Sequence, residues 1–303
     1  WAFAGRGLEW GGKIYVGATS DTAAPMLMVS SAGGQTFVPQ AWTATAGPPL
    51  RFVARAGCIV AGAEGGLCYS LDDGVTWALG GDALASGLGI VTDGTNFLAL
   101  ASSTLFHRSA DGVTWVSALA SSLPLTVIRD IAGTAGALLI AGGNSVSPRS
   151  RTYRSTNGGA TWSLAISAAT STGTSMYPAA AGGALCAVGH ATNGVYFSGD
   201  SGATWALRTT TTGASPIRLA IQGSVTLGTN ATTAALARST DGGASLQDAP
   251  PIAAPGVPIA DHHRIPWPAG GSLWILTARP FANLPEGPSV APHYSENNGD
   301  SWS

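Results

Sequence analysis

Charged residues are scarce in this sequence, and lysine is almost absent. Asp, Glu, Lys and Arg make up 10% of the 303 residues, the formal net charge is -2, and Lys13 is the single lysine. So little charge of either sign creates no field that would attract nucleic acid or an acidic membrane surface. We therefore expect no nucleic-acid partner.

Cysteines and long apolar runs are also few. The three cysteines, Cys58, Cys68 and Cys186, cannot all pair within the chain, so we expect three small buried thiols. No apolar run reaches the length of about eighteen residues that a membrane span needs. The sequence has neither an initiator Met nor the charged and then apolar start of a signal peptide, which suggests a piece of a longer polypeptide.

Several catalytic patterns are missing from the sequence. It contains no long amphipathic helix, no Gly-rich phosphate loop before a helix, no Ser nucleophile elbow and no Cys-x-x-Cys pair. These absences argue against nucleotide-binding, α/β-hydrolase and thiol-redox chemistry, and they indicate no cofactor.

A short glycine-containing stretch recurs along the whole chain. "STNGGATW" begins at Ser155, "SLDDGVTW" at Ser70 and "SGDSGATW" at Ser198. Shorter or looser copies bring the set of starts to Ser30, Ser70, Ser109, Ser155, Ser198, Ser239 and Ser295. We call these stretches boxes. A spacing near forty residues is typical of a repeat fold, in which each period is one supersecondary unit.

One period reads as four short strands. Residues 87–119 contain "LGIVT", "NFLALA", "TLFHRS" and "VTWVSA", separated by Asp-Gly-Thr, Ser-Ser and Ala-Asp-Gly. Runs of this length that are rich in β-branched and aromatic residues and bounded by turn residues indicate antiparallel strands. We predict an all-β, seven-bladed β-propeller of four-stranded antiparallel blades, a single domain over residues 1–303. "WAFAG" at residues 1–5 resembles "WALGG" at 77–81, so we expect the N-terminal strand to complete the last blade and close the ring.

Each box is predicted to be the turn from the third to the fourth strand of a blade. Glycine supplies positive φ, Asp or Asn accepts hydrogen bonds from turn N–H groups, and Ser and Thr hydroxyls join the same network. The tryptophan then packs the fourth strand onto the sheet. This interpretation gives the box a structural role; its acidic or amide positions are Asp72, Asp111, Asn157, Asp200 and Asp241, and its tryptophans are Trp77, Trp115, Trp162, Trp205 and Trp302.

These stretches resemble the Asp-box, or bacterial neuraminidase repeat, Ser-x-Asp-x-Gly-x-Thr-Trp. "YRSTNGGATW" at residues 153–162 also keeps the Tyr-Arg lead-in common in that family, with Asn157 in place of Asp. The resemblance implies a sialidase-like propeller. It does not imply one activity, because the repeat occurs in sialidases, other glycoside hydrolases, sorting receptors, photosystem assembly factors and phage tail proteins.

The face opposite the boxes is the predicted binding face, because it carries the long segments 38–49, 142–151, 163–176, 247–263 and 279–291. An arginine recurs before the predicted turn between the first and second strands of five repeats, and Tyr177 takes that place in another. The candidate ligand-binding residues are Arg6, Arg51, Arg129, Arg218, Arg264 and Tyr177. Guanidinium groups suit carboxylate, sulfate or phosphate ligands. The alternative is that these arginines pair with backbone carbonyls or with Glu9, Asp130 and Asp261 between blades.

A catalytic interpretation rests on Arg264 and the two residues that follow it. Arg264-Ile265-Pro266 resembles the Arg-Ile-Pro motif of sialidases, whose arginine binds the substrate carboxylate. That family also implies a tyrosine nucleophile with a glutamate beside it and an aspartate acid/base, for which Tyr177, Glu9 and Asp261 are the candidates here. The family also needs an arginine triad. The glutamates available beside Tyr177 are Glu9, Glu64, Glu286 and Glu296, of which Glu296 belongs to a box and Glu64 to a tight turn, so the set is incomplete. His262, His263 and His293 with Asp261 offer a metal site, but adjacent histidines on a strand point to opposite faces, so we predict none.

Three functions follow from these observations, of which the third is an intracellular assembly factor that binds a protein partner across the loop-bearing face. The first is a non-catalytic recognition or structural propeller in an extracellular or virion-associated assembly such as a phage tail fibre or tail tip. Its partners would be a surface glycan or a protein receptor, together with other subunits or domains of the assembly. The second is a sialidase-like glycoside hydrolase that acts on acidic glycans.

Overall fold

A computed structural model gives the structure of the chain. It describes residues 2–3, 7–20, 24–31, 36–40, 42, 47, 49–63, 65–80, 89–101, 105–119, 123, 125, 127–134, 136–143, 150–168, 176–180, 183–190, 194–209, 218–229, 236–249, 265–268, 274–277 and 293–297. All elements in these ranges are β-strands. None of these residues forms a helix that is long and apolar enough to cross a membrane.

The strands form antiparallel sheets in which each strand pairs with the next one along the chain, except that β1 pairs with β3. The first sheet contains β1 (Ala2–Phe3), β2 (Leu8–Trp10), β3 (Lys13–Thr19), β4 (Pro25–Ser30) and β5 (Val38–Gln40). The second contains β6 (Pro49–Arg55), β7 (Cys58–Ala63), β8 (Gly66–Ser70) and β9 (Ala78–Leu79). The third contains β10 (Gly89–Thr92), β11 (Phe97–Leu100), β12 (Leu105–Ser109) and β13 (Val116–Leu119).

The remaining sheets continue the same pattern. The fourth contains β14 (Val127–Thr134), β15 (Ala137–Gly143), β16 (Ser150–Ser155) and β17 (Ser163–Ala168). The fifth contains β18 (Met176–Ala180), β19 (Cys186–His190), β20 (Gly194–Ser198) and β21 (Ala206–Arg208). The sixth contains β22 (Arg218–Gln222), β23 (Val225–Thr229), β24 (Leu236–Ser239) and β25 (Gln247–Ala249), and the last contains β26 (Ile265–Pro268), β27 (Trp274–Thr277) and β28 (His293–Ser295).

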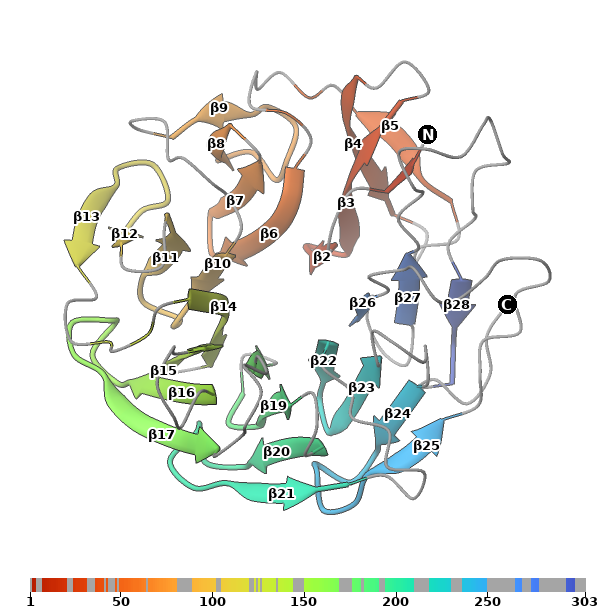
Figure 1. Ribbon diagram of the computed structural model, residues 1–303. Helices are drawn as coiled ribbons and strands as arrows, with labels where there is room; N and C mark the ends of the chain where they lie inside the picture. Colours follow the sequence, from red (N-terminus) through yellow and green to blue (C-terminus); the bar gives the residue numbers. More distant parts are fainter. Residues whose placement is uncertain are drawn as a thin grey trace.

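The sheets follow one another around a common centre (Figure 1). In the first sheet β2 is innermost, in the later sheets the first strand is innermost, and the last strand of each sheet is outermost. This arrangement is that of a β-propeller domain. The four strands predicted within residues 87–119 correspond to β10 to β13, so the interpretation of one repeat as a four-stranded antiparallel sheet is confirmed.

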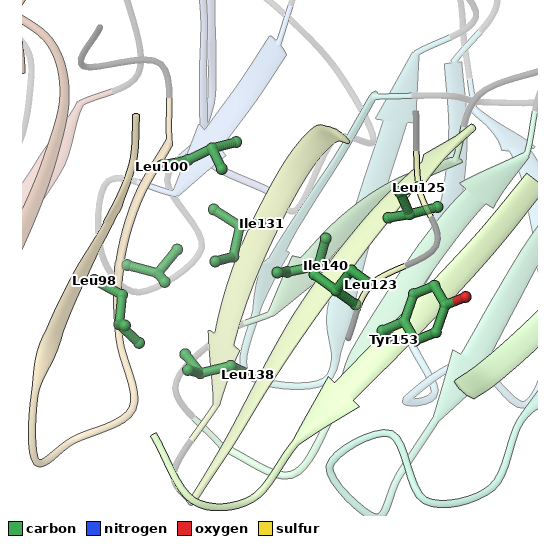
Figure 2. Packing of buried hydrophobic residues seen from close by; sticks show 9 residues of the cluster. Leu98, Leu100, Leu123, Leu125, Ile131, Leu138, Ile140 and Tyr153 are labelled. Carbon is green, nitrogen blue, oxygen red and sulfur yellow. The ribbon is translucent and has the colours of Figure 1, made fainter. Parts of the chain in front are cut away.

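The core lies between neighbouring sheets. The second strands are the most deeply buried elements: every residue of β7, β11 and β19 is buried. Figure 2 shows one such contact, in which Leu98 and Leu100 of β11 face Ile131 of β14, with Leu138 and Ile140 of β15 behind it. The three cysteines are also buried and free, as predicted. Burial raises the pKa of the Cys68 thiol to about 12.

The structure corrects the prediction for the N-terminal strand. Ala2 and Phe3 of β1 pair with Thr19 and Ala18 of β3, so β1 belongs to the first sheet and does not complete the last one. The reason is local: β2 and β3 are joined by Gly11 and Gly12, with φ of 59° and 74°, and this tight hairpin directs the preceding chain along β3. Among the described residues, the last sheet has three strands.

Four of the segments predicted to be long loops contain strand residues. The segment 163–176 begins with the six-residue strand β17, and the segment 38–49 begins with β5. The segment 142–151 includes the end of β15 and the start of β16, and 247–263 includes β25. The loop prediction missed outer strands because they are short and lack strict alternation. The segment 279–291 lies outside the described residues.

Candidate functional site

The hydrogen bonds of the turns define two faces of the domain. The Gly242 N–H, in a box, donates to the Ser224 carbonyl in the β22–β23 turn at 3.0 Å, and the Ser201 N–H, in another box, donates to the Ala184 carbonyl before β19 at 2.9 Å. The boxes and the turns between first and second strands therefore lie on one face, which we call the box face. The inner strands begin on the opposite face, which we call the entry face.

The box at Ser70 is a closed hydrogen-bond network. The Ser70 hydroxyl donates to Asp72 Oδ1 at 2.7 Å and accepts from the Gly74 N–H at 2.8 Å. Asp72 Oδ1 accepts from the Thr76 N–H at 2.8 Å, and the Thr76 hydroxyl donates to Asp72 Oδ2. The indole N–H of Trp77 donates to the Gly74 carbonyl at 3.0 Å. Every polar group that the box conserves between its copies thus has a partner within the turn.

The other boxes repeat these contacts with small changes. Ser109, Ser198 and Ser239 donate to Asp111, Asp200 and Asp241. Asn157 replaces the carboxylate without loss of a contact: its Oδ1 accepts from the Ser155 hydroxyl and the Thr161 N–H, each at 2.9 Å, and its Nδ2 donates to the Thr161 hydroxyl at 2.8 Å. In the last sheet the Ser295 hydroxyl donates to Asn297 Oδ1. Trp302 and most of the box at Ser30 lie outside the described residues.

These contacts keep the box carboxylates ionised. Hydrogen bonds from the hydroxyl and the N–H of Thr76 lower the pKa of Asp72 to about 2. Hydrogen bonds from the N–H groups of Thr114 and Val113 lower the pKa of Asp111 to about 2, and those from Ser245 do the same for Asp241. The pKa of Asp200 is also lowered, chiefly by Thr204. A carboxylate held in this form does not supply a proton at neutral pH.

Several contacts tie neighbouring sheets together on the box face. Arg55, the last residue of β6, donates to the carbonyls of Thr95 and Ala110 in the third sheet, and its guanidinium lies 5.3 Å from the centre of the Phe97 ring. Arg154 donates from Nε to the Ser201 carbonyl at 2.7 Å, and Arg208 donates to the Ala244 carbonyl at 2.8 Å. None of these three arginines is among the binding candidates predicted from the sequence. Two of them could have been found from their positions, since Arg154 directly precedes a box and Arg55 directly precedes a hairpin turn.

An ion pair bridges two inner strands near the entry face. Arg51 of β6 donates from Nη1 to Asp130 Oδ1 at 2.6 Å and from Nη2 to Asp130 Oδ2 at 3.3 Å. The Asp130 side chain is 1% exposed and that of Arg51 is 18% exposed. These strands belong to the second and fourth sheets, and β10 of the third sheet, only four residues long, lies between them in the chain order of the sheets. The ion pair therefore joins the second and fourth sheets past the inner strand of the third sheet.

A β-bulge precedes each member of this ion pair. The pairing of β6 with β7 shifts between Pro49 and Arg51, and that of β14 with β15 shifts between Ile128 and Asp130. Leu50 and Arg129 are thus the extra residues. A bulge bends its strand and redirects the side chains that follow it. Equivalent bulges on two strands give Arg51 and Asp130 the same offset, and this brings them together.

The candidate arginines therefore divide into separate groups. Arg51 adopts the alternative considered for the whole set, a pairing with Asp130 between sheets. Arg129 is the extra residue of the β14 bulge, Arg218 begins β22 and Tyr177 lies in β18. For these three residues the structure describes only the backbone. Arg6, Asp261 and Arg264 lie outside the described residues.

The catalytic and metal candidates are dispersed in the same way. Glu9 is exposed in β2 of the first sheet, whereas Tyr177 belongs to the fifth sheet. His293 begins β28, and His262 and His263 are not among the described residues. Within the part of the chain that the structure describes, no group of three or more His, Cys, Asp or Glu residues is arranged to hold a metal ion.

Solved structures show the same fold at low sequence identity. YCF48 from Cyanidioschyzon merolae is 12% identical, with a TM-score of 0.61 over 91% of this chain and 93% of that one. The GH74 xyloglucanase from Xanthomonas campestris is 15% identical, with a TM-score of 0.59 over 96% of this chain and 58% of the enzyme. The extracellular domain of the putative one-component system BT4673 from B. thetaiotaomicron is 12% identical, with a TM-score of 0.65 over 91% of this chain and 37% of that one.

A second YCF48 structure, bound to D1 peptide, is 15% identical, with a TM-score of 0.50 over 68% of this chain and 66% of that one. No curated protein matches the chain in sequence. A family model does match it, over residues 4–241, which is well over half of its length. The chain belongs to the DUF6242 beta-propeller domain family.

Proposed function

We propose that this chain is a non-catalytic recognition propeller that binds a protein segment or a surface glycan through its entry face, as part of a larger extracellular or virion-associated assembly. In this proposal the sheets are the blades of a closed, seven-bladed ring with an Asp-box turn in each blade. Because β1 pairs within the first sheet, it does not link that sheet to the last one. In this proposal the first and last sheets therefore close the ring by packing against each other.

The observation that carries the proposal is the bulged ion pair of Arg51 and Asp130. It locks the entry ends of two inner strands in a fixed arrangement, and a rigid scaffold is what a binding surface requires. Two guanidinium N–H groups of Arg51 donate to Asp130, so others remain for a carbonyl or carboxylate of a partner. The bulged Arg129 is adjacent in sequence to Asp130 on the same inner strand.

The chemistry of the carboxylates supports a non-catalytic role. Four box aspartates serve as hydrogen-bond acceptors with lowered pKa values, and Asp130 serves as the partner of Arg51. Most glycoside hydrolases use two facing carboxyl groups, one of which donates a proton. The binding of D1 peptide by YCF48, a protein of the same fold, favours a protein segment as the partner.

The alternative is a glycoside hydrolase. The fold is compatible with it, since a GH74 xyloglucanase shares it, and Tyr177 with Arg264 would be its central residues. The two proposals differ in turnover. Sialidase-type cleavage of a fluorogenic sialoside that Tyr177→Phe abolishes would establish the enzyme.

Binding can be tested by screening the purified chain against a glycan array and a peptide library. We expect Arg129→Ala and Arg218→Ala, on the inner strands, to weaken binding of the best ligand by about tenfold each if a charge-assisted contact is lost. Arg108→Ala is the matched control, because Arg108 lies in the third strand of its sheet next to a box. Equal loss with the control, or ligand binding that none of these changes alters, would contradict an entry-face site.

A further inference from the structure

A histidine is fully buried between the fourth and fifth sheets. His190 ends β19 and is 0% exposed. Two residues earlier on the same strand, Val188 packs against Ala141 of β15 and Ile166 of β17, in an apolar contact that joins the two sheets. Because alternate residues of a strand share one face, His190 faces the fourth sheet as well. The second strand of a sheet runs from the box face to the entry face, so this imidazole lies at the entry end of the junction.

The opposing surface of the fourth sheet is polar at the same level. Thr152 of β16 pairs with Ala141 and Ile166, so it lies between them on the face that meets Val188. Ser150, two residues nearer the entry face, shares that face, and its neighbour on β15 is Gly143. Both hydroxyl side chains are 0% exposed. Ser150, Thr152 and His190 thus form a buried polar layer at the entry end of the apolar contact, which we call the polar layer.

The repeat itself does not require a histidine at this place. Cys186 pairs with the box residue Ser198, and His190 follows it by four residues. The corresponding residues of the second strands in the first four sheets, counted from the partner of the box serine, are Ala18, Ala63, Ala101 and Gly142. The junction of the fourth and fifth sheets therefore contains a titratable group where the other sheets have a small residue.

The described groups around His190 carry no negative charge. On the fourth sheet they are the hydroxyl groups of the polar layer and Gly143. On the fifth sheet the strand partners of His190 are Met176 and Gly194, and Tyr196 packs beside Val188. A charged imidazole would lose its hydration in these surroundings. Burial accordingly lowers the pKa of His190 from its ordinary value of 6.5.

The charged residues of the neighbouring strands are engaged elsewhere. Arg151 lies between Ser150 and Thr152, so it points to the opposite face, where it donates to the Tyr153 hydroxyl at 3.3 Å. Arg154 donates to a carbonyl on the box face. The strands β14 to β20 contain one acidic residue, Asp130, and Arg51 pairs with it. On the other face of β19, Ala187 and Leu219 of β22 belong to one apolar cluster.

We propose that His190 is a pH-sensitive latch that closes the junction between the fourth and fifth sheets at the entry face. The neutral imidazole completes the polar layer and keeps water out of the junction. In weak acid the imidazole takes a proton from water and leaves the junction, and the entry ends of β19 and β20 separate from the fourth sheet. Histidine suits this role because its charge changes near neutral pH.

The direction and size of the effect follow from linkage. The folded-state pKa of His190 is lowered, so the closed junction is fully stable above pH 6.5 and loses stability as pH falls below it. In the open state the imidazole is hydrated and takes its ordinary pKa. Between about pH 7.5 and pH 5.5 the ratio of open to closed junctions therefore rises by up to about tenfold. This interval lies above the range in which the box aspartates titrate.

Hydrogen exchange measured by mass spectrometry at both pH values tests the latch, after correction for the intrinsic exchange rate. We expect the protection of β19 and β20 in the wild type to fall by up to about tenfold on acidification, and that of β11 to stay constant. His190→Gln keeps a polar side chain that does not titrate, so its β19 protection should not depend on pH. His107→Gln is the matched control, because burial also lowers the pKa of His107, which lies in β12 and is only partly buried.

A wild type whose β19 protection is the same at both pH values overturns the proposal. So does a fall that β11 shares, that His190→Gln retains, or that His107→Gln removes. A titration of the His190 imidazole by NMR needs no variant, and a pKa of 6.5 or above in the folded wild type would also overturn it. Ligand binding at the entry face is measured separately and does not depend on this result.

Discussion

Ser70 shows how much one hydroxyl group contributes to a box. It is 2% exposed, it donates to Asp72 and it accepts from the Gly74 N–H. Ser70→Ala leaves that N–H without its acceptor, so we expect the free energy of unfolding to fall by about 1–3 kcal/mol. Urea denaturation measures the change. Ser163→Ala is the control, because Ser163 is exposed and makes a single 3.3 Å bond to the Arg154 carbonyl; equal losses would contradict the role given to Ser70.

The box aspartates make stability depend on pH. Hydrogen bonds within the boxes lower the pKa values of Asp72, Asp111 and Asp241 to about 2 in the folded chain, from the ordinary value of 3.8 for an aspartate. A lowered folded-state pKa contributes stability that is fully present above the unfolded pKa and is lost as pH falls through the folded pKa. We therefore expect these boxes to weaken between pH 4 and pH 2.

Asn157 supplies the matched substitution for a test. It makes the box contacts without a titrating group, so Asp72→Asn, Asp111→Asn and Asp241→Asn combined are expected to keep the fold. The urea midpoint of this triple variant should fall less between pH 4 and pH 2 than that of the wild type. An unchanged slope would show that other carboxyl groups dominate acid unfolding.

At the scale of the elements, some sheets approach each other through their backbones. A Cβ atom on Gly17 of β3 would lie 1.6 Å from the Pro49 carbonyl oxygen of β6. Gly17→Ala therefore requires the first and second sheets to separate, and we expect a loss of roughly 1–3 kcal/mol or more in the free energy of unfolding. Gly183→Ala is the control, since a Cβ there meets nothing within 4 Å. Thermal unfolding measures both variants, and equal midpoints for the two would contradict the role given to this contact.

The ion pair between β6 and β14 is the second connection at this scale. Arg51→Met removes the charged partner of the buried Asp130 carboxylate, and we expect a loss of about 3 kcal/mol in the free energy of unfolding, at the lower end for a buried pair because Arg51 is 18% exposed. Arg51→Met with Asp130→Asn removes the charge while an oxygen acceptor remains for the Ile131 N–H, so this variant should lose less. A double variant that is less stable than the single one, in urea denaturation, would contradict this account.

The same elements show how far the sequence predicts the structure. The boxes and the four strands within residues 87–119 were predictable because their hydrogen bonds lie within or between neighbouring stretches of the chain, as in the contacts of Ser70 with Asp72 and Gly74. The partner of Arg51 is 79 residues away and depends on two bulges, so counting residues along a strand gave its position but left its partner open. The strand β17 was missed because its bulge interrupts the alternation of exposed and buried residues.

At the scale of the whole molecule, the proposed ring closure determines how the chain opens. The second strands form the buried centre of each sheet, including β3 in the first sheet and β15 in the fourth. In a closed ring every sheet is covered on both sides, so the amide hydrogens of β3 and β15 should exchange with similar protection, through one cooperative unfolding event. In an open ring the first sheet lacks a neighbour on one side and β3 exchanges sooner. Hydrogen exchange measured by mass spectrometry separates the two, with the outer strands β9 and β21 as the fast-exchanging reference in both cases. Protection of β3 well below that of β15 would contradict closure, and with it the rigid entry face on which the proposed binding depends.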